Sequence, residues 1–509
     1  MVTLSKVSIK NFKFYIDDTI EINKKGFLVY GENGVGKSSF FNALYYLLYG
    51  YFDNGVLENL EEHQNRTKQG DTELVLELSN GESIEIKNGT LIDDTSVIDK
   101  QNIYMLDYRF LESFADSKDF FKTLKESQIR FGIFDDIFKD INTIKSQLDI
   151  DETEIVESRI ELDEKITKQL VNIQSHTNDI IKELKENFKV TLELIGSQFI
   201  IGETKNTFIE PKIYIKIDGV DNYTSHFNES KIKILSLALV FSIIELTKEQ
   251  IEKNTKESLK LLVLDDFLSS LDMGNRLYIM EYIFNHFEEY QKIILTHNAL
   301  FFNIIKRLIH VHNKHNMWEY KNIYQSLRSD GVYEPKILAE RDYLKNAKEA
   351  FDDLDYEQCG HLLRKEIERI MAQATFLFRT GKKESLEDAI THIRQRNRYY
   401  INSNKVLEDM NLYYEKFKTK QFENDNISVN RKLEIMMKKL DQCFEDINID
   451  SDRLNQILEN INFYQTITNQ ASHYESGIDY HKIEYQEALQ DVKKLKDIFE
   501  DFNKNQNKG

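Results

Sequence analysis

Cysteine, proline and long apolar runs are scarce in this sequence. Its 509 residues include only two cysteines and two prolines. Two cysteines are too few for a disulfide framework or a cysteine-based zinc cluster, and so few prolines leave long helices uninterrupted. No run of 18 apolar residues is present to span a membrane, and the N-terminal residues lack the apolar core of a secretory signal. These absences favour a largely helical, cytoplasmic protein without a membrane partner.

Positive charge is also in deficit. The chain has 67 lysines and arginines against 86 aspartates and glutamates, which gives a net charge of −19. Proteins that coat nucleic acid usually carry a basic surface, so the charge balance does not support nucleic acid as a partner, although a local basic groove is compatible with it. The length predicts about three domains.

Segments with strand-like patterns lie on both sides of a segment with helical spacing. Apolar patterns predict strands within 2–32, 74–92, 103–107, 198–218, 259–265 and 292–297. Over 117–195 the spacing predicts two antiparallel helices of about 30 residues each, joined near 149–151, as a plain helical subdomain or a short coiled coil. Because strands flank this insert, we expect one α/β domain built from both sides of it, with helices after residue 340.

A phosphate-binding motif occurs early in the chain. "GENGVGKSS" at residues 31–39 fits the pattern G-x-x-x-x-G-K-[ST] and lies between an apolar strand and a helix. Its glycines let the backbone wrap around phosphates, and the helix N-terminus favours anionic oxygen. Lys37 should reach the β- and γ-phosphates, and Ser38 should ligand Mg²⁺. The motif predicts a site for ATP with Mg²⁺, formed by Asn33, Gly34, Gly36, Lys37, Ser38 and Ser39.

Two later apolar strands end in side chains that are useful beside bound phosphate. "LKLLVLDDFLSSLD" (259–272) ends its strand in Asp265 and Asp266, and "KIILTHN" ends its strand in His297. The carboxyl ends of strands in an open α/β sheet lie beside the phosphate loop. We therefore expect Asp265 to hold Mg²⁺, Asp266 to orient the attacking water, and His297 to hydrogen-bond the γ-phosphate.

The order of phosphate loop, helical insert, apolar helix, "VLDDFLSSLD" and "ILTHN" resembles the ABC-type ATPase heads of the SMC, RecF and Rad50 class, as does the opening strand "VSIKNFKF". The resemblance covers residues 1 to 316. It implies a homodimer of heads, or a higher oligomer, that sandwiches two ATP molecules, with Ser270 and Asp272 in a D-loop at the interface. The family's Q-loop glutamine has no clear counterpart: 104–110 lies at that place, and Gln101 is a weaker alternative.

The stretch "HFNESKIKILSLALVFS" (226–242) resembles the family's signature motif, a turn at a helix start that binds the γ-phosphate held by the other subunit. Asn228 stands where the family has serine, and Glu229 and Ser230 stand where it has glycines. A helix N-terminus favours an anion, but the charge of Glu229 opposes phosphate binding. Two interpretations stay open: a degenerate signature that acts in trans, and an ordinary capped helix.

Within this class, the short insert argues against chromosome-scale SMC proteins, whose arms are far longer. The Asp265-Asp266 pair, together with a helical C-terminal domain, resembles the ATPases of bacterial antiphage systems of the Septu, PARIS, PrrC and RloC types. The resemblance implies a slow ATPase that controls a separate effector nuclease. The alternative is an ATP-gated ribonuclease with its own site at Arg364, Glu368 and His473. Arg364 and Glu368 also fit a plain ion pair between residues four apart on a helix. A DNA-repair ATPase is a third, less favoured interpretation.

These motifs together predict the fold class and the domain order. The fold class is α/β, an ABC-type P-loop ATPase head with a helical, short coiled-coil insertion and an all-helical C-terminal domain. We expect the N-terminal lobe of the head at 1–116, the insertion at 117–195, the C-terminal lobe of the head at 196–338, and the helical effector or partner-binding domain at 339–509.

Overall fold

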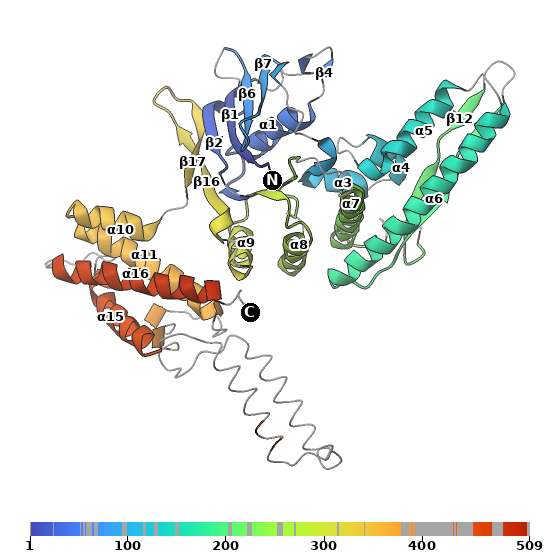
Figure 1. Cartoon of the computed structure of the whole chain (residues 1–509). Helices are drawn as coiled ribbons and strands as arrows, with labels where there is room; N and C mark the ends of the chain where they lie inside the picture. The colour runs from blue at the N-terminus through green and yellow to red at the C-terminus, as the bar shows by residue number, and fades with distance from the viewer. Residues whose placement is uncertain are drawn as a thin grey trace. The chain divides into compact units, whose positions relative to one another are not determined.

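A computed structural model divides the chain into two compact units (Figure 1). The first comprises residues 1–309 and 314–340, and the second comprises 310–313 and 341–509. The described residues are 2–377, 386–387, 390–391, 431, 434, 451–470 and 482–505, apart from internal gaps at 24, 51, 54–55, 58–63, 66–69, 94–98, 116–118, 127–130, 148–151, 202–205, 221–225, 252–257, 269–270, 313–314 and 340–341. The main division lies close to the predicted start of the helical domain at residue 339.

A six-stranded sheet forms the centre of the first unit. Its order is β17-β16-β3-β15-β14-β9, and all neighbours are parallel except β16 and β17. Every residue of β9, β14 and β15 is buried, which accounts for their continuous apolar runs. The strands expected at 103–107, 259–265 and 292–297 are confirmed. The six strands are β3 (Gly26–Gly31), β9 (Ile103–Asp107), β14 (Leu261–Asp265), β15 (Gln291–Thr296), β16 (Trp318–Leu327) and β17 (Tyr333–Ala339).

An antiparallel sheet shares a hydrophobic core with helix α1 (Lys37–Tyr49) and the parallel strands. The strand-like segment at 74–92 contains a hairpin, in which the turn at Asn80 and Gly81 joins β6 to β7. The buried amide of Gln291 exchanges two hydrogen bonds with the backbone of Leu4, which ties the two sheets together. In sheet order the strands are β2 (Tyr15–Glu21), β1 (Leu4–Phe12), β6 (Glu73–Leu78), β7 (Ser83–Lys87), β8 (Thr90–Asp93), β5 (Val56–Leu57) and β4 (Phe52–Asp53).

Three helices cover the other face of the parallel sheet: α7 (Glu229–Ile251), α8 (Met273–His286) and α9 (Ala299–Val311). Side chains along β3 point alternately to the two faces of the sheet. Leu28 packs in the core with these helices, whereas its neighbours Phe27 and Val29 pack in the core with α1. Residues 232–244 of α7 are all buried. This burial accounts for a helix that is apolar on almost every side.

The insert differs from the predicted pair of equal helices. Its second half is one helix, α6 (Glu152–Glu183), but its first half divides into α4 (Phe120–Glu126), a 3₁₀ turn at 132–134 and α5 (Asp135–Ser146). Phe121 and Phe134 join the core of the head, and Gly132 packs closely against Gln101 and Thr247. The first half therefore packs on the head instead of pairing along α6 for about 30 residues. The predicted joint at 149–151 lies outside the described residues.

Small strands complete the insert. β10 (Val190–Ile195) pairs with β13 (Lys212–Ile217), and β11 (Gln198–Ile200) pairs with β12 (Thr207–Ile209). Side-chain amides of α6 bond the backbone of β10: Asn178 bonds both groups of Val190, and Gln174 accepts from the N–H of Leu192. These bonds occupy a strand edge that would otherwise present unpaired backbone groups. The boundary expected at residue 195 falls between β10 and its partner strand.

The second unit is helical in its described residues. It contains α10 (Tyr343–Asp352), α11 (Tyr356–Leu377), α15 (Ser451–Gln470) and α16 (Lys482–Asn505), and apolar side chains from all four form one core. Glu366 is buried in this unit. Arg369 donates two hydrogen bonds to its carboxylate, and Nζ of Lys496 lies 3.9 Å from it. The buried charge is thereby neutralised between α11 and α16.

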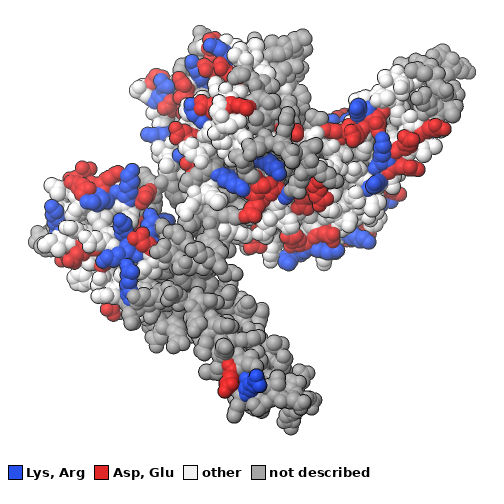
Figure 2. Space-filling model, in the orientation of Figure 1, with Lys and Arg blue, Asp and Glu red and all other residues white. Residues whose placement is uncertain are grey.

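The described surface carries charge of both signs. On the face shown in Figure 2, acidic and basic side chains are interspersed on both units. Taken unit by unit, the described residues visible in this view do not form the continuous basic stripe that broad nucleic-acid binding requires. Among the described helices, none has both the length and the apolar character needed to cross a bilayer.

Candidate functional site

The phosphate loop connects β3 to α1 at the carboxyl edge of the parallel sheet. Two of its glycines have left-handed backbone angles, with φ of +82° at Gly34 and +113° at Gly36. A side chain at either position would strain the backbone, and a Cβ on Gly36 would also lie 3.1 Å from the ring of Phe14. Asn33 is exposed and Ser39 is partly exposed. The loop thus presents its backbone at the N-terminus of α1, where a phosphate is favoured.

Lys37 is the first residue of α1, and its buried ammonium turns back toward the loop. Nζ donates to the carbonyl oxygens of Gly31 at 2.7 Å and Glu32 at 2.9 Å, and it lies 3.9 Å from Oδ2 of Asp266. Burial lowers the pKa of Lys37, and the carboxylates of Asp266 and Asp265 oppose this effect. The ammonium is therefore held within the loop that would enclose a phosphate.

Asp265 ends β14 and is buried. The hydroxyl of Ser38 donates to its Oδ2 at 3.0 Å, whereas its buried Oδ1 has no hydrogen-bond partner among the described residues. Burial raises the pKa of Asp265 to about 7, and repulsion by Asp266 adds to the effect, while Ser38 and Lys37 oppose it. A buried, unbonded carboxylate oxygen beside a serine hydroxyl matches the oxygen ligands that Mg²⁺ prefers. These two residues fit the expected metal.

Asp266 and His297, predicted as catalytic residues on separate strands, are in direct contact. Nδ1 of His297 lies 2.8 Å from Oδ1 of Asp266, and the backbone N–H of His297 donates to the same oxygen at 2.9 Å. The backbone N–H of Asp266 donates to the carbonyl of Leu295, and its φ is +46°, a left-handed angle that aspartate tolerates better than most residues. The turn after β14 thus aims this carboxylate at the end of β15.

The start of α7 combines a helix cap with a charge pair. Oδ1 of Asn228 accepts the backbone N–H of Lys231 at 3.0 Å, which is an N-cap bond. The carboxylate of Glu229 lies 2.7 Å from Nζ of Lys233, a buried lysine one turn later. Lys233 therefore offsets the charge that opposed a signature function. Ser230 lies in the same first turn. Binding of another subunit's phosphate by this stretch stays a prediction.

One of the two predicted D-loop residues is described. Asp272 is the N-cap of α8, where its side chain accepts a backbone N–H of the first turn, and Ser270 lies outside the described residues. Nε of Arg276, a buried residue of α8, donates to the carbonyl of Leu271 at 2.8 Å. The carboxylates of Asp266 and Asp272 both attract this guanidinium. Arg276, which the sequence motifs did not indicate, thus bonds the turn before α8 and feels the charge of both aspartates.

The edge strand β9 contributes a carboxylate that the motifs also missed. Asp107 ends β9 opposite Asp265 in the parallel register and precedes α3 (Tyr108–Ala115). Its side chain holds the guanidinium of Arg109 at 2.9 Å. Gln101, the weaker Q-loop alternative, donates instead to Asp135 of α5 at 2.6 Å. A sequence signal for Asp107 does exist: "IYMLD" is an apolar strand that ends in aspartate, as "LLVLD" is for Asp265.

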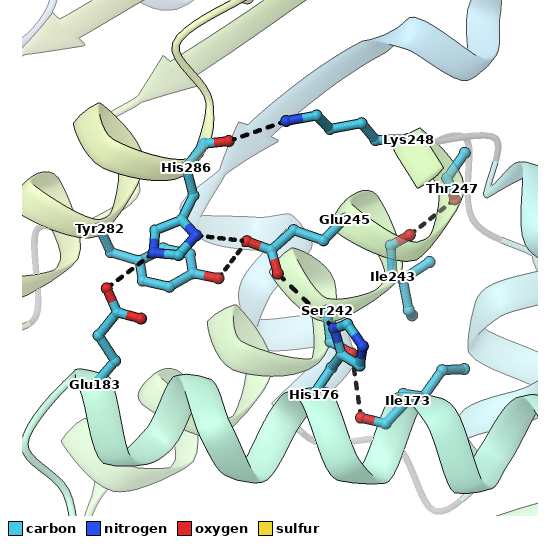
Figure 3. Close-up of polar contacts among 10 residues, drawn as sticks. All are labelled: Ile173, His176, Glu183, Ser242, Ile243, Glu245, Thr247, Lys248, Tyr282 and His286. Carbon is cyan, nitrogen blue, oxygen red and sulfur yellow. Dashed lines mark hydrogen bonds and ion pairs between the residues drawn. The ribbon is translucent and has the colours of Figure 1, made fainter. Parts of the chain in front are cut away.

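A polar cluster joins the insert to the helices that follow the signature stretch and the D-loop (Figure 3). His286 at the end of α8 lies between two carboxylates, with Nε2 2.9 Å from Glu183 of α6 and Nδ1 3.3 Å from Glu245 of α7. Glu245 also accepts from the hydroxyl of Tyr282, and Nδ1 of His176 lies 4.0 Å from its other oxygen. The cluster thereby connects α6 to both helices.

The predicted ribonuclease residues are only partly described. Nε of Arg364 donates to Glu368 at 3.0 Å, as expected for residues four apart on α11. His473 lies outside the described residues. Within the described part of the chain, no group of three histidine, cysteine, aspartate or glutamate side chains is arranged to hold a metal ion. A catalytic role for this set stays a prediction.

The phosphate loop, the aspartates after β14 and the histidine after β15 converge at one edge of a parallel sheet, an arrangement that defines an ABC-type P-loop ATPase head. Residues 3–319 match the family model described as the RecF/RecN/SMC N terminal domain, and the chain belongs to this family. The predicted fold class is confirmed, and the head is an ATP-binding ATPase of the SMC/RecF type.

Similar solved structures include the recombination mediator protein RecF with ATP, which is 16% identical over 66% of this chain and 98% of that chain, with a TM-score of 0.41. The Smc head bound to the C-winged helix domain of ScpA is 17% identical over 67% and 99%, with a TM-score of 0.38. The SMC head domain from Thermotoga maritima is 16% identical over 67% and 99%, with a TM-score of 0.31. No curated protein matches the chain.

Proposed function

We propose that this protein is an ATP-driven switch of a bacterial antiphage defence system, whose heads pair around Mg²⁺-ATP and whose C-terminal helices control a separate effector nuclease. The observation that supports the ATP cycle best is the convergence of five side chains, with contacts of 3.0 Å between Ser38 and Asp265 and 2.8 Å between Asp266 and His297. The defence role and the effector rest on the resemblance of the motifs.

Each residue of the site has a distinct task in this proposal. Ser38 and Asp265 would hold Mg²⁺, which neutralises charge on the β- and γ-phosphates. Lys37 would exchange its loop carbonyls for phosphate oxygens. Asp266 would orient the attacking water, and His297, fixed by Asp266, would hydrogen-bond the γ-phosphate. The resemblance to SMC and RecF heads places Asp266 where such heads carry a glutamate. Aspartate is one methylene shorter, so we expect slow turnover that the second head accelerates.

Removing the charge of Glu229 is expected to strengthen ATP-dependent pairing of the heads. Glu229→Gln would remove a negative charge from the stretch that faces the other head's phosphate, and it would release Lys233 from its carboxylate. We expect dimerisation about tenfold tighter with Mg²⁺-ATP, as measured by analytical ultracentrifugation. Glu126→Gln is the control, because Glu126 is an exposed glutamate that pairs with a lysine four residues away, Lys122, on α4.

Asn228→Ala is expected to have the opposite effect on dimerisation. It should weaken pairing and should also cost α7 about 1 kcal/mol through the lost cap. If the folded Glu229→Gln and Asn228→Ala variants both dimerise like the wild type, the start of α7 is an ordinary capped helix.

Two experiments test whether the effector nuclease is a separate protein: affinity purification and an assay for RNA cleavage by the purified chain. Affinity purification from its own cell should recover a nuclease subunit, and the purified chain should leave total tRNA intact with or without ATP. Cleavage of tRNA that disappears in His473→Ala would instead establish the ribonuclease alternative and overturn the separate effector. His361→Ala, which changes an exposed histidine of α11, is the control.

A further inference from the structure

We propose that Arg109 binds the γ-phosphate of the ATP held in its own head and stabilises the charge that develops there during hydrolysis. This inference rests on the proposed ATP cycle and adds a residue outside the phosphate-binding motifs. Arg109 follows β9, whose last residue, Asp107, lies beside Asp265 at the carboxyl edge of the parallel sheet. The chain thus brings a guanidinium to the sheet edge that carries the phosphate loop.

Asp107 anchors the guanidinium. Nε and one terminal nitrogen of Arg109 both lie 2.9 Å from Oδ2 of Asp107. Oδ1 of Asp107 caps α3 by accepting the backbone N–H of Phe110 at 2.8 Å. The side chain of Asp107 is 11% exposed, whereas that of Arg109 is 62% exposed. A largely buried, doubly engaged carboxylate therefore holds an accessible guanidinium, whose planar array of five N–H donors suits phosphate.

Two other charged groups interact electrostatically with this guanidinium. Asp265, the expected metal ligand, attracts it electrostatically. The pKa of Lys13 is lowered mainly by burial and also by the positive charge of Arg109. Lys13 directly precedes Phe14, whose ring packs against Gly36 of the phosphate loop. Arg109 therefore interacts electrostatically with the expected metal ligand and with Lys13, the residue before the ring that packs against the phosphate loop.

A purely structural role accounts for less of this arrangement. Most of the Arg109 side chain stays open to solvent in this ion pair, and Asp107 caps α3 without help from Arg109. The sheet edge also gathers the carboxylates of Asp107, Asp265 and Asp266, which repel a nucleotide. A cation held at this edge offsets that repulsion.

The reaction places charge where the guanidinium acts. A water oxygen bonds to the γ-phosphorus as the bond from that phosphorus to the bridging oxygen breaks. ATP⁴⁻ and water give ADP³⁻ and H₂PO₄⁻, which then releases a proton to solvent. The transferring phosphoryl group and the bridging oxygen carry the charge in the transition state, and a positioned guanidinium stabilises it.

Arg109→Ala should lower kcat about a hundredfold while the affinity for ADP changes by less than about twofold. Arg109→Lys keeps the charge without the planar fork and should retain an intermediate rate. Asp107→Asn keeps a capping side chain but weakens the contact with the guanidinium, and it should lower kcat about tenfold. Arg328→Ala is the matched control, since Arg328 is an exposed arginine paired with Asp330 and Glu334 in the same unit.

A readout without turnover uses Mg²⁺-ADP with aluminium fluoride, which mimics the planar phosphoryl group. Arg109→Ala should lose most of the rise in Tm produced by this complex, yet keep the rise produced by Mg²⁺-ADP alone. Added guanidinium ion should restore part of its hydrolysis rate. If the wild type hydrolyses ATP and Arg109→Ala matches it in kcat and in aluminium fluoride binding, the inference is wrong and the proposed function stands. If the wild type neither binds nor hydrolyses ATP, the proposed function and the inference both fail.

Discussion

Lys37→Ala is expected to weaken ATP binding by at least about a hundredfold. Nζ of Lys37 bonds the carbonyls of Gly31 and Glu32 at 2.7 and 2.9 Å, so the loop already holds a buried ammonium at its centre. Losing a desolvated charge contact to phosphate costs about 3 kcal/mol, which corresponds to this change in Kd. Calorimetric titration with a non-hydrolysable ATP analogue measures the effect directly.

The control for this variant is Lys6→Ala, because Lys6 forms a partly exposed ion pair with Glu77 in the antiparallel sheet, outside the phosphate loop. It should bind ATP like the wild type. Thermal unfolding must accompany the titration, since Lys37 also bonds the loop itself. A folded Lys37→Ala protein with unchanged nucleotide affinity would falsify the assignment of this loop as the ATP site.

Asp266→Asn is expected to slow hydrolysis by at least about a hundredfold while ATP binding is retained, so that closed head dimers accumulate. Asparagine keeps an oxygen that can accept the backbone N–H of His297, and it tolerates the left-handed φ of +46° at this position. The local structure should therefore survive. What is lost is the carboxylate that orients water and a negative charge close to the γ-phosphate.

Two measurements check this expectation: phosphate release under saturating ATP and sedimentation with and without ATP. Asp330→Asn is the control, because Asp330 is an exposed aspartate in the turn between β16 and β17 that accepts the backbone N–H of Val332. Hydrolysis at the wild-type rate in Asp266→Asn would mean that another residue orients the water. Slow hydrolysis without a shift toward dimers would separate catalysis from head pairing.

Much of the candidate site was predictable because its parts are specified locally. The phosphate loop requires glycine where the backbone has positive φ, as at Gly34 and Gly36, and this demand leaves a contiguous motif. Asp265, Asp266 and His297 follow buried strands, whose apolar runs are visible without any knowledge of their neighbours. Parallel pairing then brings their ends to one edge of the sheet, a general property of such folds.

Other parts were not predictable because they depend on partners distant in sequence. The first half of the insert has helical spacing, yet Phe121 and Phe134 pack into the core of the head and break the expected long pair of helices. The approach of Asp107 to Asp265 depends on strand order, since β9 pairs with β14 across more than a hundred residues of chain. No local pattern encodes such a pairing.

Local sequence patterns are enough to predict the class of this protein, an α/β P-loop ATPase head with a helical insert, together with the residues of the phosphate loop and the strand ends. Those features depend on backbone angles and apolar periodicity, which neighbouring residues specify. The folded chain alone places Lys233 against the carboxylate of Glu229 and holds Arg109 on Asp107, at the end of the strand that pairs with the strand of Asp265. Side-chain charges interact through space over a few ångströms, and only the folded chain sets those distances.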